Sequence, residues 1–331
     1  ETGFGDSGLM EALEEAVDRG VQVRLIFNSA LDDKKDPAGS RSARLESMGV
    51  DVRYINKIMH HKYALIDGPR EALSVNATDQ GILVTGSGNW SNSAGTRYDE
   101  NTVVLFGNAE LNMKFQREFN HMWTHSRDFN NGENHEFFES DSIAETMIVD
   151  DPSVDVAFTS DNFRTYLSTR HGQTFSVIRG MNTVADKLVE AIEGANESIW
   201  IASGHLRSRP ISEALLRKHE AQPDLDIRVY LDGQEYVSDY AHRSELSDRD
   251  DCIAAAGTSQ TKIDDCLDKS YHYSWDIDDA GIDLRFKYYS YRWHYSYAEQ
   301  MHHKYMIVDG EKVLSGSYNY SDNAEHNTLE N

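Results

Sequence analysis

Short runs of apolar, mostly β-branched residues alternate with longer amphipathic stretches along most of the chain. The apolar runs predict strands at Val21–Phe27, Val50–Tyr54, Tyr63–Ile66, Val103–Phe106, Ile199–Ala202, Ile227–Leu231 and Lys304–Val308. The amphipathic stretches "LMEALEEAVDRG" and "ISEALLRKHEAQ" predict helices that lead into two of these strands. Helices that alternate with strands predict an α/β fold in which helices pack on mixed sheets.

The same pattern occurs in both halves of the chain. "MHHKYALIDG" at Met59–Gly68 returns as "MHHKYMIVDG" at Met301–Gly310, and "VTGSGNWSNSAGTRYDEN" returns as "LSGSYNYSDNAEHNTLEN". The separation of Gly86 from Glu100 in sequence equals that of Gly316 from Glu330, so the two registers agree. An internal repeat of this kind predicts two similar α/β/α sandwich halves that form a pseudo-dimer within one chain.

The repeat also predicts where the halves begin and end. We expect a first half at residues 1–129, a connector rich in Asn, Glu, Asp and Ser at residues 130–160, and a second half at residues 161–331. The second half opens with "NTVADKLVEAIEGANESIWIAS", which has no counterpart in the first; the first closes with "TVVLFGNAELNMKFQREFNHMW", which has none in the second. We therefore expect a missing N-terminal strand in the first half and a missing C-terminal strand and helix in the second. Either the natural protein is longer at both ends or its outer strands are supplied in another way.

Strand alternation separates the repeated polar residues into two groups. His60 and Lys62 share one face and His61 points to the other, and His302, Lys304 and His303 follow the same rule. We therefore expect His61 and His303 to be packed or hydrogen-bonded behind a site that the other residues form. Metal ligation by the paired histidines is not favoured.

Further polar residues recur at matching positions. Ser87, Asn89, Ser317 and Asn319 follow glycines and are suitable neutral donors for phosphate oxygens, to which the lysines add positive charge. A catalytic histidine also needs a carboxylate that sets its tautomer. The candidates for this role are Asp67, Asp309, Glu100 and Glu330.

The pattern H-x-K-x4-D followed by G-S-x-N resembles the signature of the phospholipase D superfamily. Both copies match it, at His60, Lys62, Asp67, Gly86, Ser87 and Asn89, and at His302, Lys304, Asp309, Gly316, Ser317 and Asn319. The similarity covers most of the chain except the loops around Ala30–Arg44, the connector, and insertions after Asp232 and Phe286.

The resemblance implies a mechanism without a metal or other cofactor. Both histidines would face one phosphodiester: one attacks phosphorus to form a phosphohistidine, while the other protonates the leaving oxygen and then activates water. In many family members the first copy supplies the nucleophile, so we expect His60 to attack and His302 to act as the acid. His60, Lys62, Asp67, His302, Lys304 and Asp309 are the predicted catalytic residues. Ser87, Asn89, Ser317, Asn319, Glu100 and Glu330 are the predicted substrate-binding residues.

The resemblance indicates the bond that is cleaved but not the substrate. The chain has 56 acidic and 32 basic residues, a formal charge of −24, which disfavours nucleic acids and strongly anionic membranes. We therefore expect a phospholipase D-type enzyme that hydrolyses, or transfers to alcohols, the distal phosphoester of a phospholipid at a membrane or micelle surface. A metal-independent nuclease on the same machinery is the alternative, and a non-enzymatic binding module is a third reading. A monomer with two internal repeats is expected.

The insertion "FKYYSYRWHYSYAEQ" supports more than one interpretation. Its alternating aromatic residues are Tyr289, Tyr291, Trp293, Tyr295 and Tyr297, with Lys287, Arg292 and His294 nearby. These residues could enclose a choline-like ammonium or an acyl chain, stack on nucleic-acid bases, or form the packed face of a β-hairpin.

The two cysteines, Cys252 and Cys266, lie in one acidic, polar stretch in which a loop-closing disulfide is plausible. A disulfide would favour a secreted or periplasmic protein. No apolar run approaches the ~20 residues that a membrane-spanning helix needs. The acidic segment "DIDDAGID" at Asp276–Asp283 lacks the full pattern of a calcium loop and is expected to be a solvated turn.

Overall fold

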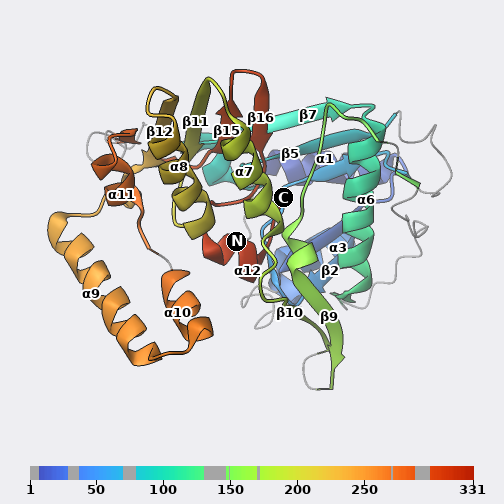
Figure 1. The fold of residues 1–331 in the computed structure, drawn as a ribbon. Coiled ribbons are helices and arrows are strands. Elements are labelled where there is room, and N and C mark those ends of the chain that lie inside the picture. The colour runs from blue at the N-terminus through green and yellow to red at the C-terminus, as the bar shows by residue number, and fades with distance from the viewer. Residues whose placement is uncertain are drawn as a thin grey trace.

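The computed structural model describes residues 7–28, 37–69, 80–129, 147–148, 150–169, 172–269, 271–287 and 299–331. Its helices and strands alternate along the chain, and the molecule has the two-halved, mixed α/β architecture that the repeat predicts (Figure 1).

The second half is built on one five-stranded mixed sheet in the order β13-β12-β11-β15-β16. These strands are β11 (Ser198–Ser203), β12 (Asp226–Asp232), β13 (Asp283–Lys287), β15 (Lys304–Val308) and β16 (Lys312–Ser315). The helices and turns of this half are α7 (Thr183–Gly194), α8 (Arg209–Ala221), η4 (Gly233–Glu235), α11 (Ser274–Asp279) and α12 (Asp322–Asn327). Apolar residues of α7 and α8 pack on β11, β12 and β15 in one continuous core.

The first half contains two separate three-stranded sheets, in the orders β1-β2-β8 and β4-β5-β7. The strands are β1 (Arg24–Asn28), β2 (Asp51–Ile55), β4 (Ala64–Ile66), β5 (Ile82–Gly86), β7 (Thr102–Phe106) and β8 (Ser126–Asp128). The helices are α1 (Ser7–Asp18), η1 (Pro37–Gly39), α3 (Arg41–Ser47), α5 (Asn92–Arg97) and α6 (Ala109–Thr124). The two halves therefore differ in one strand: among the described residues, no strand joins β1 to β4 as β11 joins their counterparts β12 and β15.

The observed strand boundaries agree with the predicted ones where a strand pairs with a neighbour on each side. β15 covers the predicted range Lys304–Val308. β1 begins at Arg24 and not at Val21, because its pairing with β2 begins only where Arg24 meets Asp51. In the first motif, residues 60–63 lie just before β4 and not within a strand.

Two short strand pairs connect the halves. β14 (Gln300–Met301) of the second half pairs with β6 (Tyr98–Asp99) of the first. β17 (Thr328–Leu329) of the second pairs with β3 (Ile58–Met59) of the first, and both pairs are parallel. The histidine after each pair is held by its backbone: His60 N–H donates to Leu329 O at 3.0 Å, and His302 N–H to Asp99 O at 2.9 Å. The connection therefore has pseudo-two-fold symmetry.

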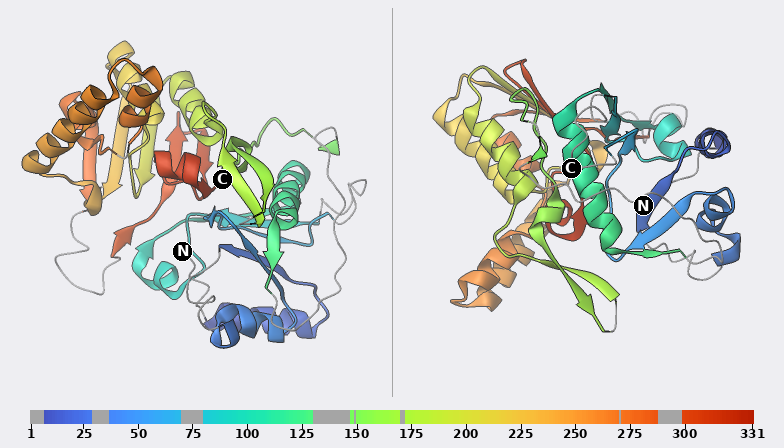
Figure 2. Two further views of the ribbon diagram at one scale, coloured as in Figure 1. Left: turned by 90° about the horizontal axis from the view of Figure 1, so that it is seen from below. Right: turned by 90° about the vertical axis from the view of Figure 1, so that its right-hand side faces the viewer.

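Two elements project from this body. Between the halves, η3 (Thr159–Asn162) leads into an antiparallel hairpin of β9 (Phe163–Ser168) and β10 (Gly172–Val177), which extends away from the helices (Figure 2). In the second half, α9 (Asp239–Ala256) and α10 (Gln260–Leu267) lie at the edge farthest from the first half (Figure 1). None of the described helices is long and apolar enough to cross a membrane.

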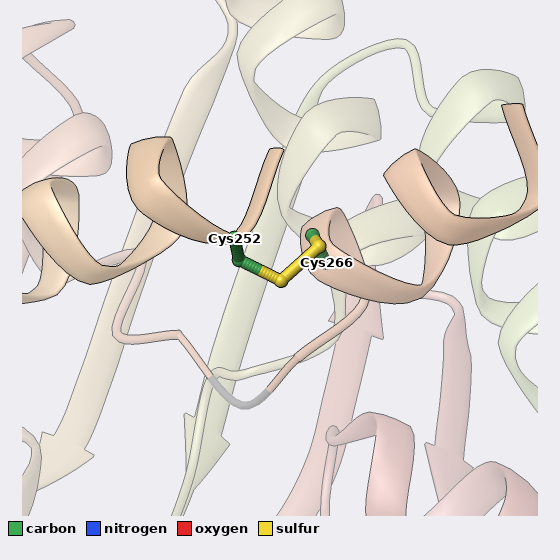
Figure 3. Close-up of a disulfide and its surroundings, with 2 residues drawn as sticks. All are labelled: Cys252 and Cys266. Atoms are coloured by element: carbon green, nitrogen blue, oxygen red, sulfur yellow. A yellow bond between two sulfur atoms is a disulfide. The ribbon is translucent and has the colours of Figure 1, made fainter. Parts of the chain in front are cut away.

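A disulfide joins α9 to α10, as the sequence suggests. Cys252 and Cys266 have Cα atoms 5.8 Å apart and are bonded through their sulfur atoms (Figure 3). α9 contributes no buried residue to the core, so the bridge is a main attachment between the two helices.

Removal of this bridge by Cys252→Ser and Cys266→Ser should loosen α9 and α10 while the body stays folded. A disulfide that closes a loop of this size stabilises the folded state by about 3 kcal/mol, because it restricts the unfolded chain. Here the stabilised part is the pair of helices α9 and α10. Hydrogen exchange of residues 239–267 should accelerate, with little change elsewhere. Wild-type protein under reducing conditions is the matched control; loss of protection throughout the second half would contradict the prediction.

Candidate active site

Each repeated histidine is paired with a carboxylate from the opposite half. His60 Nδ1 lies 2.7 Å from Glu330 Oε2, and His302 Nδ1 lies 2.7 Å from Glu100 Oε1. Because a carboxylate accepts this hydrogen bond, the proton of each neutral ring is placed on Nδ1. The Nε2 lone pair of each imidazole is then available to attack or to take up a proton.

The two lysines of the motifs lie beside these histidines and are buried. Lys62 Nζ donates to the His60 carbonyl at 2.6 Å, and Lys304 Nζ donates to the His302 carbonyl at 2.8 Å. The charge of Lys304 acts on His60 and that of Lys62 acts on His302, so both motifs contribute to one site.

Burial dominates the titration of this cluster. It lowers the pKa of His60 to about 4, against the opposing charge of Glu330 and together with the charge of Lys62. Burial also lowers the pKa of His302, with the hydrogen bond to Glu100 opposing it. The pKa of Lys62 falls to about 8 through burial, and the pKa of Lys304 falls to about 7 through burial and the nearby Lys62 charge. Burial therefore favours the neutral form of both imidazoles and makes both lysine side chains lose their protons more readily.

Glu330 remains ionised although it is fully buried. Burial acts to raise the pKa of Glu330, but the charge and hydrogen bond of His60 outweigh it and the net shift is downward. Its second oxygen accepts a hydrogen bond from Thr328 Oγ1 at 2.9 Å. Glu100 and Glu330, predicted as substrate-binding residues, are therefore placed as the carboxylates that orient the histidines.

The hydroxyls of the motif serines are hydrogen-bonded within the protein. Ser87 Oγ donates to Glu100 Oε2 at 2.7 Å and accepts from Asn101 N–H at 2.9 Å. Ser317 Oγ accepts from Asn331 N–H at 3.0 Å, and both serines have no exposed surface. Their hydroxyls thus position neighbouring protein groups, because burial beneath the site keeps them from a substrate phosphate.

The glycines before these serines have a packing role. A Cβ on Gly86 would lie 2.2 Å from Asn101 O, and a Cβ on Gly316 would lie 2.2 Å from Asn331 O. The backbone that approaches each glycine is the segment that carries the orienting glutamate. A side chain at either position would displace that segment.

The motif asparagines remain candidates for substrate binding. Asn89 lines a cavity that also contacts His60 and Lys62. Asn319 has a buried Oδ1 with no hydrogen-bond partner among the described residues. An amide oxygen accepts hydrogen bonds, so this unpaired atom suits a hydroxyl or water donor, and only the amide NH₂ group of Asn319 could donate to a phosphate oxygen.

The motif aspartates do not orient the histidines. The Asp309 carboxylate accepts the backbone N–H groups of Asn196, Glu197 and Ser198 at 2.7–3.0 Å, at the turn that leads into β11. These donors, Ser198 first, lower the pKa of Asp309 to about 2. Asp67 occupies the equivalent position, where it is exposed, and both aspartates have positive φ, 52° and 55°. Asp309 therefore caps a turn in this structure, and its predicted catalytic role stays a prediction.

His61 and His303 lie behind the site as expected. His61 contacts Glu118 at 3.1 Å and Asn331 at 3.3 Å, while His303 contacts Asn101 at 3.2 Å. The roles of Asn101 and Asn331 were missed, although each copy of the repeat ends in Glu-Asn and this pairing was a usable signal.

Two features lie outside the repeated motifs: the aromatic insertion and a group of acidic residues in the first half. The aromatic insertion, including Arg292 and His294, lies outside the described residues apart from Lys287, which is buried and forms an ion pair with Asp99. Among the described residues, Glu46, Asp51 and Asp128 form a group with metal-ligand geometry. Glu46 already accepts a hydrogen bond from Val52 N–H at 2.6 Å, so this group has a structural use in the first half.

Comparison with known proteins identifies similar chains. The family model described as "Cardiolipin synthase, PLD-like domain" matches residues 3–123 and 188–331. A mitochondrial cardiolipin hydrolase of Chlamydomonas reinhardtii is 31% identical over 117 residues, 35% of this chain and 45% of the relative. One from Xenopus tropicalis is 31% identical over 107 residues, 32% of this chain and 43% of the relative. The chain thus spans about half the length of the curated relatives it matches.

A solved structure supports the fold across nearly the whole chain. Polyphosphate kinase from Porphyromonas gingivalis superposes with a TM-score of 0.50 at 15% identity. The match covers 98% of this chain and 40% of the kinase.

The exchanged glutamates and the turn-capping aspartate should respond differently to neutral substitution. Glu100→Gln and Glu330→Gln should each lower kcat roughly 10²-fold or more, because an amide no longer fixes the histidine tautomer. Asp309→Asn should lower the melting temperature with a much smaller change in kcat. Steady-state kinetics and thermal melts on the same three variants test this; an Asp309→Asn variant as inactive as the glutamine variants would restore its catalytic assignment.

The pH profile should be bell-shaped and lie towards the acidic side. Below about pH 4 His60 becomes protonated and loses its nucleophilic lone pair, so kcat/KM should fall. Above about pH 7–8 Lys304 and Lys62 lose charge, so kcat/KM should fall again. A chromogenic phosphodiester with a good leaving group isolates the lysines, since its departure needs little help from an acid. A constant kcat/KM from pH 6 to pH 10 would contradict the assignment.

Proposed function

Because the chain belongs to the family of cardiolipin synthase-type, phospholipase D-like domains, we propose that it is a phosphoric diester hydrolase that acts on phospholipids. The observation that carries this proposal is the exchange of carboxylates between halves. Two histidines of defined tautomer, each with a buried lysine, form one cluster to which both copies of the repeat contribute. A paired site of this kind suits a reaction that needs a nucleophile and an acid at the same phosphorus atom.

In the first step His60 Nε2 attacks phosphorus, the new P–N bond forms, and the P–O bond to the leaving alcohol breaks. His302 gives its proton to that oxygen. In the second step His302 removes a proton from water, the resulting hydroxide attacks phosphorus, and the P–N bond breaks. Lys62 and Lys304 stabilise the charge on the equatorial oxygens, and Glu330 stabilises the His60 imidazolium while it exists.

The environments of the two histidines support His60 as the nucleophile. Burial lowers the pKa of His60 to about 4, which keeps its ring neutral over the physiological range. Burial also lowers the pKa of His302, but the hydrogen bond to Glu100 is the next largest influence and raises it, which favours the protonated form that an acid needs. A neutral nucleophile and a protonated acid are the forms that the first step requires.

Relatives and charge both support a lipid substrate. The similar curated proteins are named mitochondrial cardiolipin hydrolases, and cardiolipin is a phospholipid. The formal charge of −24 opposes long polyanions such as nucleic acids. We propose hydrolysis of the distal phosphoester at a membrane or micelle surface by a monomer, in a secreted or periplasmic location that is supported by the disulfide.

A substrate panel tests the proposed class. Phosphatidylcholine, phosphatidylethanolamine, cardiolipin, single-stranded DNA and a chromogenic phosphodiester are compared with a chelator present throughout. Release of head group or phosphatidic acid from a lipid, with no cleavage of DNA, is the expected result. Activity that requires one added metal, or that is confined to DNA, would contradict the proposal.

The covalent step has its own signature. A small alcohol should compete with water for the phosphohistidine, so product should divide between acid and transferred ester in proportion to alcohol concentration. Two in-line displacements should give net retention at phosphorus. In His302→Ala, a substrate with a good leaving group should leave a phosphorylated peptide that contains His60. Inversion with no alcohol transfer would mean direct attack by water, and a label on the peptide of His302 would reverse the two roles.

A further inference from the structure

A third histidine is held by a buried carboxylate, although neither motif includes it. His205 Nδ1 lies 2.9 Å from Glu235 Oε1, in the arrangement that orients His60 and His302. Because the carboxylate accepts this hydrogen bond, the neutral ring carries its proton on Nδ1 and keeps a lone pair on Nε2. In the described part of the chain, this is the one hydrogen bond that the His205 ring forms. The side chain is 24% exposed, so a ligand can reach the ring.

Glu235 is also fixed by groups other than this histidine. Its side chain is 1% exposed, and it accepts hydrogen bonds from Arg207 Nη2 at 2.7 Å and from Leu206 N–H at 3.2 Å. Burial acts to raise the pKa of Glu235, but the hydrogen bonds of His205 and Arg207 outweigh it and lower the pKa to about 2. The carboxylate is therefore ionised, and Arg207 and Leu206 keep it paired when His205 is replaced.

The pair of His205 and Glu235 lies at the edge of the sheet where the second motif begins. His205 follows the carboxyl end of β11 at Ser203, and Glu235 belongs to η4, which follows the carboxyl end of β12. β11 and β12 are parallel neighbours, so these two ends meet (Figure 1). Ser203 is also opposite Lys304 in the pairing of β11 with β15. The pair and the motif therefore share one end of the sheet, the end at which ligands of open α/β sheets bind.

The backbone next to this pair packs on the segment that carries His302. A Cβ on Gly204 would lie 3.1 Å from Met301 O and 3.9 Å from His302 Cα, so the chain passes directly against that histidine before it reaches His205. From the neighbouring strand, Asp232 Oδ2 accepts Met301 N–H at 2.7 Å, and η4 begins at the next residue. Both elements that supply the pair are thus in contact with the segment of the proposed acid.

The position of His302 indicates which part of the substrate His205 would meet. In the proposed reaction His302 protonates the leaving oxygen, so the groups around it face the head group and not the acyl chains. A neutral His205 offers a hydrogen-bond acceptor at this place. The hydroxyls of a glycerol head group and the ammonium of ethanolamine can donate to its Nε2, whereas the quaternary ammonium of choline has no N–H.

We propose that His205, oriented by Glu235, binds the leaving head group by accepting a hydrogen bond from a donor on it. The inference rests on the proposed phospholipid hydrolysis with His302 as the acid, and it adds a residue that selects the substrate. His205 distinguishes head groups that carry an O–H or N–H donor from choline. It takes no part in making or breaking the bonds to phosphorus.

Short-chain, soluble phosphatidylglycerol, phosphatidylethanolamine and phosphatidylcholine test this selection. His205→Leu removes the acceptor and should lower the ratio of kcat/KM for either donor-bearing lipid to kcat/KM for phosphatidylcholine roughly tenfold, the effect of one hydrogen bond. His205→Gln should retain part of this ratio, because an amide oxygen can accept in place of Nε2. The matched control is His272→Leu, which removes a histidine paired with Glu245 at 2.5 Å and should leave the ratios unchanged.

Transfer to alcohols tests the same contact without a lipid. With a chromogenic phosphodiester, the acceptor alcohol enters where the head group leaves, so His205→Leu should lower the ratio of transfer to glycerol over transfer to ethanol, which has no second hydroxyl. Equal losses with all three lipids, or unchanged ratios in both assays, would overturn the inference, because a purely structural role lowers all activities together. A wild-type enzyme that cleaves no lipid, with a lowered transfer ratio in His205→Leu, would refute the phospholipid substrate and support the contact with hydroxylated alcohols.

Discussion

The carboxylates that orient the two histidines come from the opposite half of the chain, and the rest of the structure depends on this exchange. Glu330 must reach His60 and Glu100 must reach His302, so the halves can associate in only one register. The parallel pairs of β17 with β3 and of β14 with β6 hold that register through the backbone. A buried carboxylate that lost its histidine would be an uncompensated charge, which costs several kcal/mol. The alignment of the halves is thus enforced by the same bonds that prepare the site.

Two buried lysines make this centre electrostatically incomplete without an anion. Burial and mutual repulsion lower the pKa of Lys304 to about 7, and burial lowers that of Lys62 to about 8. A phosphodiester between them would relieve both effects, because its negative charge favours the protonated amines. Glu100 and Glu330 already act in the same direction on both lysines, so an anion at this centre would add to their effect.

The residues that the sequence predicts well are those whose environment is local or repeated. β15 follows from its apolar run, and the Cys252–Cys266 disulfide follows from two cysteines in one short polar stretch. The motif histidines and lysines meet because the repeat specifies two equivalent strands. The partners of Ser87 and Asp309 do not follow from the sequence, because Glu100 and the turn at Asn196–Ser198 reach them only where the chain returns in space.

The placement of Glu330 also has a consequence for protein synthesis. His60 leaves the ribosome well before the groups that hold it in place. Its orienting carboxylate, Glu330, lies 270 residues later in the sequence, directly after its backbone partner Leu329. A nascent chain therefore displays His60 and Lys62 without the groups that give the imidazole its reactive tautomer. The reactive form of the His60 imidazole therefore requires synthesis to continue at least as far as Glu330.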